Sequence, residues 1–246
     1  MINSKDLEVI ILAAGKGSRL NSGSSNKVVL EVQGTPLIQR TIDTLRQLNL
    51  KNILVVVGHA KDSVLNLLDK DIQTVEQIEQ LGTAHAVKVA LEVTKKHIKN
   101  CLVLNGDDSF LLSKEVLEKL INHHLTSSNK ITFLTTHLDN PKGLGRIIRD
   151  TKNNLVKIVE EKEASEAEKK VKEVNLAAYL FDLEFLRENI DKVKKSQITS
   201  EYYLVTLVEQ AMANHDKVEM VFIKDLMWRG INTQEELEEA KELADI

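Results

Sequence analysis

Small and basic residues gather just after the first apolar run of this chain. Residues 12–20 read Leu-Ala-Ala-Gly-Lys-Gly-Ser-Arg-Leu, and Lys27 follows a few positions later. Two glycines without a Cβ can adopt positive φ, so consecutive backbone N–H groups can converge on anionic oxygens beside lysine and arginine side chains. The pattern predicts a site for the phosphates of a nucleotide, although a plain tight turn accommodates the same glycines. The spacing matches neither a Walker A loop nor a Gly-x-Gly-x-x-Gly loop.

The bulk composition predicts one globular domain without a membrane segment. The chain has 246 residues, of which 42% are apolar, and its apolar runs are only strand-sized. The beginning of the chain lacks the basic start and long apolar stretch of a signal peptide. Cys101 is the single cysteine, which excludes an internal disulfide and a zinc cluster and indicates a reducing compartment. We therefore expect a single domain over residues 1–246, located in the cytoplasm.

Charge and histidine usage restrict the partners. The net charge is −4, with acidic and basic residues interspersed, so no basic face for a nucleic acid is expected. The seven histidines show no spacing typical of metal ligands, and surface or capping roles are expected for them. The predicted partners are small anions, with no membrane and no nucleic acid, and the protein is expected to be a monomer or a small homo-oligomer.

The apolar pattern predicts an α/β fold with a Rossmann-like, mostly parallel, mixed sheet flanked by helices. Short β-branched runs occur at 9–12, 53–57, 101–104, 131–134 and 218–223, with amphipathic segments between most of them. Thr35 is predicted as an N-cap with Pro36 at the first helical position, and Ser113 is predicted to open another helix. Residues 83–98 are predicted as one long helix.

Loops that follow these strands are predicted to meet at one crevice. Gly15, residues 80–83 and Asp107 fall at carboxyl ends of strands, where open α/β sheets bind ligands. A subregion at about 140–205 has a different pattern, with strands near 145–149, 156–159 and 173–181 that suit antiparallel pairing. We expect this subregion to carry the substrate side of the crevice, with the charged run 160–173 mostly a solvated connection.

Several motifs in chain order resemble a known family. They are Lys27, Gln-Leu-Gly-Thr-Ala-His-Ala at 80–86, Asn-Gly-Asp at 105–107, Gly-Leu-Gly-Arg at 143–146, Ile-Val-Glu-Glu-Lys at 158–162, Glu-Val-Asn at 173–175, Glu-Tyr-Tyr-Leu at 201–204 and Gly-Ile-Asn at 230–232. Together they resemble the uridyltransferase (pyrophosphorylase) domain of N-acetylglucosamine-1-phosphate uridyltransferase, within the sugar-1-phosphate nucleotidyltransferase family. The resemblance implies a GT-A-like fold. It also implies attack of a sugar 1-phosphate oxygen on the α-phosphorus of UTP, with release of pyrophosphate.

The resemblance also implies roles for individual residues. Arg19 would act on the departing pyrophosphate and the α-phosphate, and Lys27 on the α-phosphate and the incoming phosphate. Mg²⁺ would be held by Asp107 and Asn232. Asp107 can equally be a turn-forming residue, and Asn232 can cap the following helix. The implied nucleotide-binding residues are Leu12, Ala13, Ala14, Gly15, Lys16, Gly17, Gln77, Gln80, Gly82 and Thr83. The implied sugar-binding residues are Gly145, Glu160, Asn175 and the segment 201–204 with Tyr202, although Glu160 can also be the first residue of the charged run.

Some positions depart from the family pattern. Asn26 stands where a proline usually precedes the lysine, and the spacing from Arg19 to Lys27 is one residue longer, so a looser loop is expected. Asn-Gly-Asp-Asp-Ser at 105–109 replaces Tyr-Gly-Asp-Val-Pro, which removes an aromatic wall and adds the carboxylate of Asp108. Ala177 stands in place of a glycine near the sugar, where its methyl group takes up space. These departures put sugar specificity in doubt more than nucleotidyl transfer.

Three alternatives remain open at this point. The same chemistry can act on another sugar or alcohol phosphate, or on CTP, dTTP or GTP. A noncatalytic nucleotide-sugar-binding protein would keep the fold without needing charge at a transition state. A glycosyltransferase of GT-A type ordinarily has an Asp-x-Asp motif that binds a metal ion, whereas Asp107 and Asp108 are adjacent. Because the chain ends after one more predicted helix, we expect no β-helix acetyltransferase domain.

Overall fold

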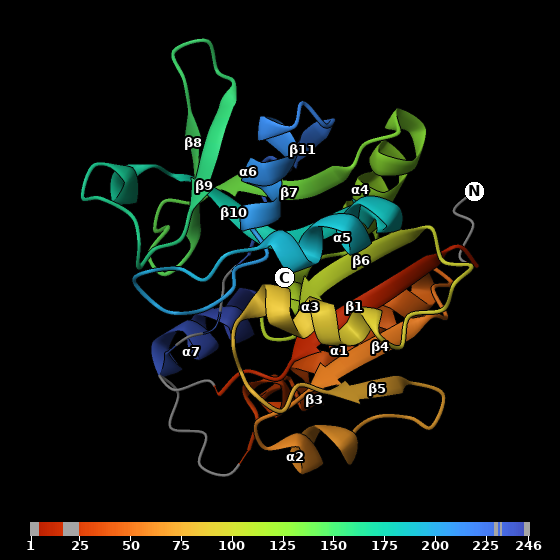
Figure 1. Ribbon diagram of the computed structural model, residues 1–246. Helices are drawn as coiled ribbons and strands as arrows, with labels where there is room; N and C mark the ends of the chain where they lie inside the picture. Colours follow the sequence, from red (N-terminus) through yellow and green to blue (C-terminus); the bar gives the residue numbers. More distant parts are fainter. Residues whose placement is uncertain (1–4, 17–24, 229–230, 232, 244–246) are drawn as a thin grey trace.

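A mixed sheet forms the centre of the molecule in the computed structural model, which describes residues 5–16, 25–228, 231 and 233–243 (Figure 1). Its strand order is β11-β7-β10-β6-β1-β4-β5, with β8 paired to β10 and β9 paired to β8. The strands are β1 (Leu7–Ala13), β4 (Ile53–Val57), β5 (Gln73–Glu76), β6 (Asn100–Asn105), β7 (Ile131–His137), β8 (Gly145–Arg149), β9 (Leu155–Val159), β10 (Glu173–Asp182) and β11 (Val218–Phe222). A separate small sheet pairs β2 (Glu31–Val32) with β3 (Thr35–Pro36).

The sheet consists of a parallel half and an antiparallel insertion. β1 pairs in parallel with β4 and β6, and β4 pairs in parallel with β5. β10 is antiparallel to both β6 and β7, while β7 and β11 are again parallel. The predicted fold class is confirmed, and so are the predicted antiparallel strands of the subregion, because β8 pairs antiparallel with β9 and β10.

Helices cover both faces of the sheet. They are α1 (Leu37–Gln47), α2 (Lys61–Leu65), α3 (Thr83–Leu91), α4 (Lys114–Ser127), α5 (Leu183–Asn189), α6 (Thr206–Ala213) and α7 (Gln234–Leu243). Alternate residues of β1 point to opposite faces: Val9 and Ile11 pack with α1 and α4, while Ile10 packs with α3. Figure 1 shows α3 and α5 in front of the sheet and the β8–β9 hairpin extending from one end of it. No helix in the described ranges is long and apolar enough to cross a membrane.

Helix boundaries agree with the sequence predictions in one case and differ in two. Ser113 caps α4 as predicted, and its hydroxyl accepts from the Val116 amide. Pro36 itself is the N-cap of α1, because Thr35 and Pro36 are paired in β3 and the helix begins one residue later. The predicted long helix ends at Leu91, where the hydrogen bonds tighten: the Glu92 and Val93 amides donate to carbonyls three residues back. The Thr94 hydroxyl oxygen lies 3.0 Å from the Ala90 carbonyl oxygen and 2.5 Å from the Glu8 carboxyl group on β1.

Candidate active site

Two cavities meet where the parallel strands end. The larger has a volume of about 600 Å³ and the smaller about 190 Å³. Residues that line only the larger cavity include Ala13, Ala14, Gly15, Lys16, Gln77, Gln80 and Gly82. Residues that line only the smaller one include Asp108, Gly145, Glu160, Asn175 and Tyr203. The residues common to both are Leu12, Lys27, Thr83, Asn105 and Asp107. The loops expected to share one crevice therefore do so.

Lys27 and Asp107 form an ion pair at the junction of the two cavities. The Lys27 side chain is 8% exposed and that of Asp107 is 30% exposed, so the pair is mostly shielded from bulk water. Gly106, before Asp107, lies close both to β1 and to the segment that carries Lys27: its amide donates to the Leu12 carbonyl at 2.9 Å, and a Cβ there would lie only 3.0 Å from that oxygen and 3.0 Å from Val28 Cγ1. The absence of a side chain at Gly106 thus lets the end of β6 approach the Lys27 segment, with the cation and the carboxylate at the centre of the crevice.

Asn26 fixes the described residues on either side of the first loop; residues 17–24 lie outside the described ranges, so the looser loop stays a prediction. Its side-chain amide donates to the carbonyls of Ala13 (2.9 Å), Gly15 (3.2 Å) and His59 (2.8 Å). Its Oδ1 accepts from the Val28 amide at 3.1 Å, and the residue is 2% exposed. A proline at this position could make none of these side-chain bonds. Asn26 therefore ties the end of β1 to the residue next to Lys27.

We expect Asn26→Ala to destabilise the protein by roughly 2–3 kcal/mol, because several buried backbone groups lose their partners. Asn26→Asp keeps the acceptor for the Val28 amide but turns an oxygen toward three carbonyls, so it should be at least as damaging. Urea unfolding of the two variants and the wild type measures the effect. A loss below about 0.5 kcal/mol in both variants would show that the network carries little energy.

Gly82 fixes the loop that follows β5. Its φ of +110° favours glycine, and a Cβ would lie 2.5 Å from the Tyr202 carbonyl oxygen. The loop is held further by the Tyr202 amide, which donates to the Leu81 carbonyl at 2.7 Å. By contrast, Gly15 does not use positive φ, and nothing lies within 4 Å of its Cβ position. Gly15 was predicted to adopt positive φ. In the structure its lack of a side chain instead leaves open space beside the larger cavity.

Two predicted ligand-binding side chains already have protein contacts. The Gln77 side-chain nitrogen lies 3.1 Å from the Gly82 carbonyl oxygen and 2.9 Å from His85 Nδ1. That nitrogen is therefore engaged with the loop rather than open to a base. The ring of Tyr202 lies under the Lys195 ammonium, 5.3 Å from its centroid, whereas the neighbouring Tyr203 is the one that lines the smaller cavity. Tyr203 lies within the predicted sugar-binding segment 201–204, in which Tyr202 was the residue named.

Glu160 and Asn175 lie together in the smaller cavity with Gly145. A Cβ on Gly145 would be 3.6 Å from both Asn175 Cβ and Glu160 Oε1. Asn175 donates to the Tyr179 hydroxyl, which fixes its orientation. Burial, helped by Glu163 and Glu201 nearby, raises the pKa of Glu160 to about 7. The charged run is less exposed than expected: only six of residues 160–173 are exposed. Glu160 faces the cavity, and Glu161 pairs at 2.6 Å with the buried Arg146.

We expect the raised pKa of Glu160 to lower the stability of the protein as the pH rises from about 4.5 to about 7. In that window the unfolded chain has lost the proton that the native state still holds, so ionisation costs the native state up to about 3 kcal/mol. Glu160→Gln removes this loss, and its stability should exceed that of the wild type at pH 8 but not at pH 4. Urea unfolding at both pH values, with the exposed Glu79→Gln as a control, measures the difference. Equal pH profiles would contradict the assignment.

Ala177 adopts a conformation that favours glycine. Its φ is +50°, at the register shift between Asn175 and Tyr179, and its amide donates to Asn175 Oδ1 at 3.1 Å. The backbone conformation at this position therefore favours the glycine of the family pattern, in addition to the space that a glycine leaves beside the sugar.

We expect Ala177→Gly to stabilise the protein by roughly 0.5–1 kcal/mol, because relief of the left-handed strain exceeds the added entropy of the unfolded chain. A lower denaturation midpoint in this variant would contradict that balance.

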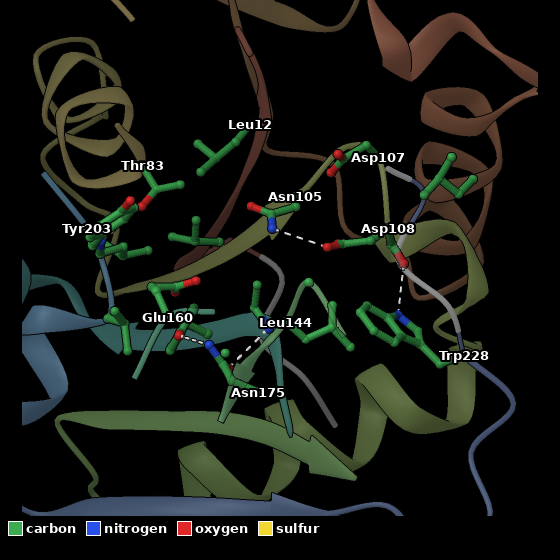
Figure 2. Close-up of a pocket in the computed structure, with 18 of the residues that line it drawn as sticks. Leu12, Thr83, Asn105, Asp107, Asp108, Leu144, Glu160, Asn175, Tyr203 and Trp228 are labelled. Atoms are coloured by element: carbon green, nitrogen blue, oxygen red, sulfur yellow. Dashed lines mark hydrogen bonds between the residues drawn. The ribbon is translucent and has the colours of Figure 1, made fainter. Parts of the chain in front are cut away.

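Asp108 is the residue whose role could not be predicted. Its Oδ2 accepts from Asn105 Nδ2 at 3.3 Å, while its buried Oδ1 has no hydrogen-bond partner among the described residues. Burial and the adjacent Asp107 raise its pKa well above the usual range. Figure 2 shows its carboxylate turned toward Asn105, with Asp107 set apart from it.

Three predicted site residues, Gly17, Arg19 and Asn232, lie outside the described residues, although Ile231 lines the smaller cavity. Within the described ranges no group of three or more His, Cys, Asp or Glu side chains could hold a metal ion.

His124 contradicts the expectation of surface histidines: it is 2% exposed, its Nδ1 lies 2.9 Å from Thr132 Oγ1, and burial lowers its pKa to about 4. Cys101 is a core residue, as its apolar strand indicates.

Comparison with known proteins identifies the family. The sequence profile of the nucleotidyl transferase family matches residues 8–245. The chain belongs to this family. Relatives named bifunctional protein GlmU include one from Exiguobacterium sibiricum, 40% identical over 209 residues that cover 85% of this chain and 46% of the relative. One from Fervidobacterium nodosum is 40% identical over 239 residues, covering 97% and 50%. One from Desulfotalea psychrophila is 37% identical over 246 residues, covering 98% and 71%.

The chain thus spans about half the length of the first two of these relatives. A solved structure described as a candidate glucose-1-phosphate thymidylyltransferase from Bacillus anthracis, in complex with a sucrose, superimposes on it with a TM-score of 0.80. The alignment covers 98% of this chain and 96% of that one at 19% identity, which shows a common fold. The family match and the shared fold account for the predicted strand–loop arrangement around the crevice.

Proposed function

We propose that this protein is a nucleotidyltransferase that joins UTP to a sugar 1-phosphate, with N-acetylglucosamine 1-phosphate as the favoured acceptor. A phosphate oxygen of the sugar attacks the α-phosphorus of UTP, the bond from that phosphorus to the β-phosphate oxygen breaks, and pyrophosphate leaves with the electron pair. The products are a UDP-sugar and pyrophosphate. The observation that carries this proposal is the Lys27–Asp107 pair at the junction of two cavities that are lined by different residues.

The arrangement suits a reaction between two anions. The larger cavity, lined by the backbone of the first loop, would hold the nucleotide, and the smaller one would hold the sugar. Lys27 would lie where the two phosphates meet, and its positive charge would reduce their mutual repulsion and stabilise charge on the transferring group. Arg19 is proposed to act on the departing pyrophosphate, because a guanidinium can bind two phosphate oxygens at once.

The residues at the junction fit a magnesium ion. Asp107 presents a carboxylate that is 30% exposed and lines both cavities, and oxygen is the donor that Mg²⁺ prefers. One or two protein oxygens are enough, since phosphates and water supply the others. We therefore propose that Asp107 and Asn232 hold Mg²⁺. When bound, the ion supplies neutralisation of phosphate charge.

The proposed substrates follow from the relatives. Several relatives at 35–40% identity are named bifunctional protein GlmU, and the motifs of this chain resemble an N-acetylglucosamine-1-phosphate uridyltransferase. The proposed partners are therefore a nucleoside triphosphate and a sugar phosphate, and the reaction would take place in the cytoplasm.

Pyrophosphate release over a matrix of nucleoside triphosphates and sugar phosphates tests the proposal. We expect the highest kcat/KM with UTP and N-acetylglucosamine 1-phosphate in the presence of Mg²⁺, and a loss of at least a hundredfold in Arg19→Ala. Release only with another pair would keep the chemistry and replace the substrates. No release with any pair would favour a noncatalytic nucleotide-sugar-binding protein.

A further inference from the structure

The carboxyl group of Asp108 has one oxygen that no group in the described part of the protein satisfies. Its Oδ2 accepts from Asn105 Nδ2 at 3.3 Å, whereas Oδ1 is buried and has no hydrogen-bond partner there. The residue itself is firmly held, because the Trp228 indole donates to its backbone carbonyl at 2.9 Å. A buried carboxylate oxygen without a partner costs free energy, so such an oxygen indicates a missing partner.

The position of Asp108 shows which substrate could provide that partner. Asp108 lines the smaller cavity together with Gly145, Glu160 and Asn175, and it does not line the larger one. The preceding Asp107 lines both cavities. The two adjacent aspartates therefore differ in what they can reach: Asp107 is at the junction, and Asp108 is on the side proposed for the sugar (Figure 2).

The fold makes little use of the Asp108 carboxyl group, whose one hydrogen bond within the described residues comes from Asn105 Nδ2 at 3.3 Å. The family motif that this chain resembles has valine at this position, so an apolar side chain of similar size can occupy it. A polar group that carries a cost in the free protein, at a position where an apolar one would fit, is typical of a residue kept for binding.

We infer that Asp108 is a specificity-determining residue whose free oxygen accepts a hydrogen bond from a hydroxyl group of the sugar phosphate. The inference rests on the proposed function and adds to it. The sugar would be one that carries a free hydroxyl next to Asp108, rather than an apolar or acylated substituent at that position. A carboxylate selects such a donor because the analogue lacking it leaves the buried oxygen unpaired.

Asp108→Val, which introduces the family residue, tests the inference with pyrophosphate release as the readout. We expect KM for the sugar phosphate to rise roughly tenfold to a hundredfold, while KM for the nucleotide and the Mg²⁺ concentration for half-maximal rate stay within twofold. A series of monodeoxy sugar phosphates then locates the contact. One analogue should be roughly tenfold to a hundredfold worse than its parent with the wild type, and nearly equal to it with Asp108→Val.

Thermal unfolding separates binding from a structural role. Because Asp108→Val removes a buried carboxyl group with an unpaired oxygen, its melting temperature should equal or exceed that of the wild type. Asp108→Ala serves as a second variant, and the exposed Asp43→Ala serves as a control.

An unchanged KM for the sugar with a raised Mg²⁺ requirement would overturn the inference, as would variants that unfold. If the wild type transfers no nucleotide to any sugar phosphate, the proposed function itself fails.

Discussion

Replacing Lys27 by alanine is expected to lower kcat for nucleotidyl transfer by roughly a hundredfold to a thousandfold. The ammonium lies at the junction of the two cavities, in a site where its side chain is only 8% exposed. Electrostatic stabilisation is strongest where water is excluded, and no neighbouring cation within the described ranges lines both cavities. Steady-state rates of pyrophosphate release measure the loss.

Two further variants make this result specific. Lys27→Arg should not restore the rate, because a planar guanidinium is larger and differently shaped than the ammonium that fits beside Asp107. Lys61→Ala removes an exposed lysine that pairs with Glu76 at 2.6 Å, and its rate should stay within twofold of the wild type. A Lys27→Ala enzyme that keeps more than a tenth of the wild-type kcat would contradict the proposed role.

The parallel strands could be predicted closely from the sequence. Residues 53–57 were predicted as a strand, and β4 has those bounds, because a strand covered on both faces is a continuous apolar β-branched run. The end of α3 could not be predicted in the same way. The amphipathic pattern continues to Thr94, although the helix ends at Leu91, and Thr94 contacts Glu8, 86 positions earlier in the chain. Local periodicity carries no signal of such a partner.

Contacts between distant residues of the candidate site could not be predicted from the sequence either. Motifs indicated which loops meet, since strand order and carboxyl ends follow general rules for α/β sheets. They did not indicate that Asn26 would bind the carbonyls of Ala13 and His59, or that Asp108 would be left with an unpaired oxygen. The sequence could not reveal these contacts because they depend on distances between loops. Asn26 and Asp108 both stand at positions where this chain departs from its family, and a departure with no local explanation is a useful signal for such contacts.

Asp107→Asn is expected to lower kcat by roughly a hundredfold to a thousandfold and to raise the Mg²⁺ concentration needed for half-maximal rate. The amide keeps the size of the side chain but loses the charge that attracts a divalent ion and pairs with Lys27. Titration of pyrophosphate release with Mg²⁺ measures both effects. The exposed Asp139→Asn, which breaks a surface pair with Lys172, is the matched control and should behave as the wild type.

The double variant Lys27→Ala/Asp107→Asn shows whether the two residues act as a unit. If both stabilise the same phosphate charge, removal of the second costs little once the first is gone, so the double variant should be about as slow as the slower single variant. Losses that multiply, to roughly ten-thousandfold or more, would mean that the two residues act independently. An Asp107→Asn enzyme with unchanged Mg²⁺ dependence would place the ion elsewhere. In that case the role of the Asp107 carboxylate would be to hold the Lys27 ammonium in position through the ion pair, and not to bind the metal ion.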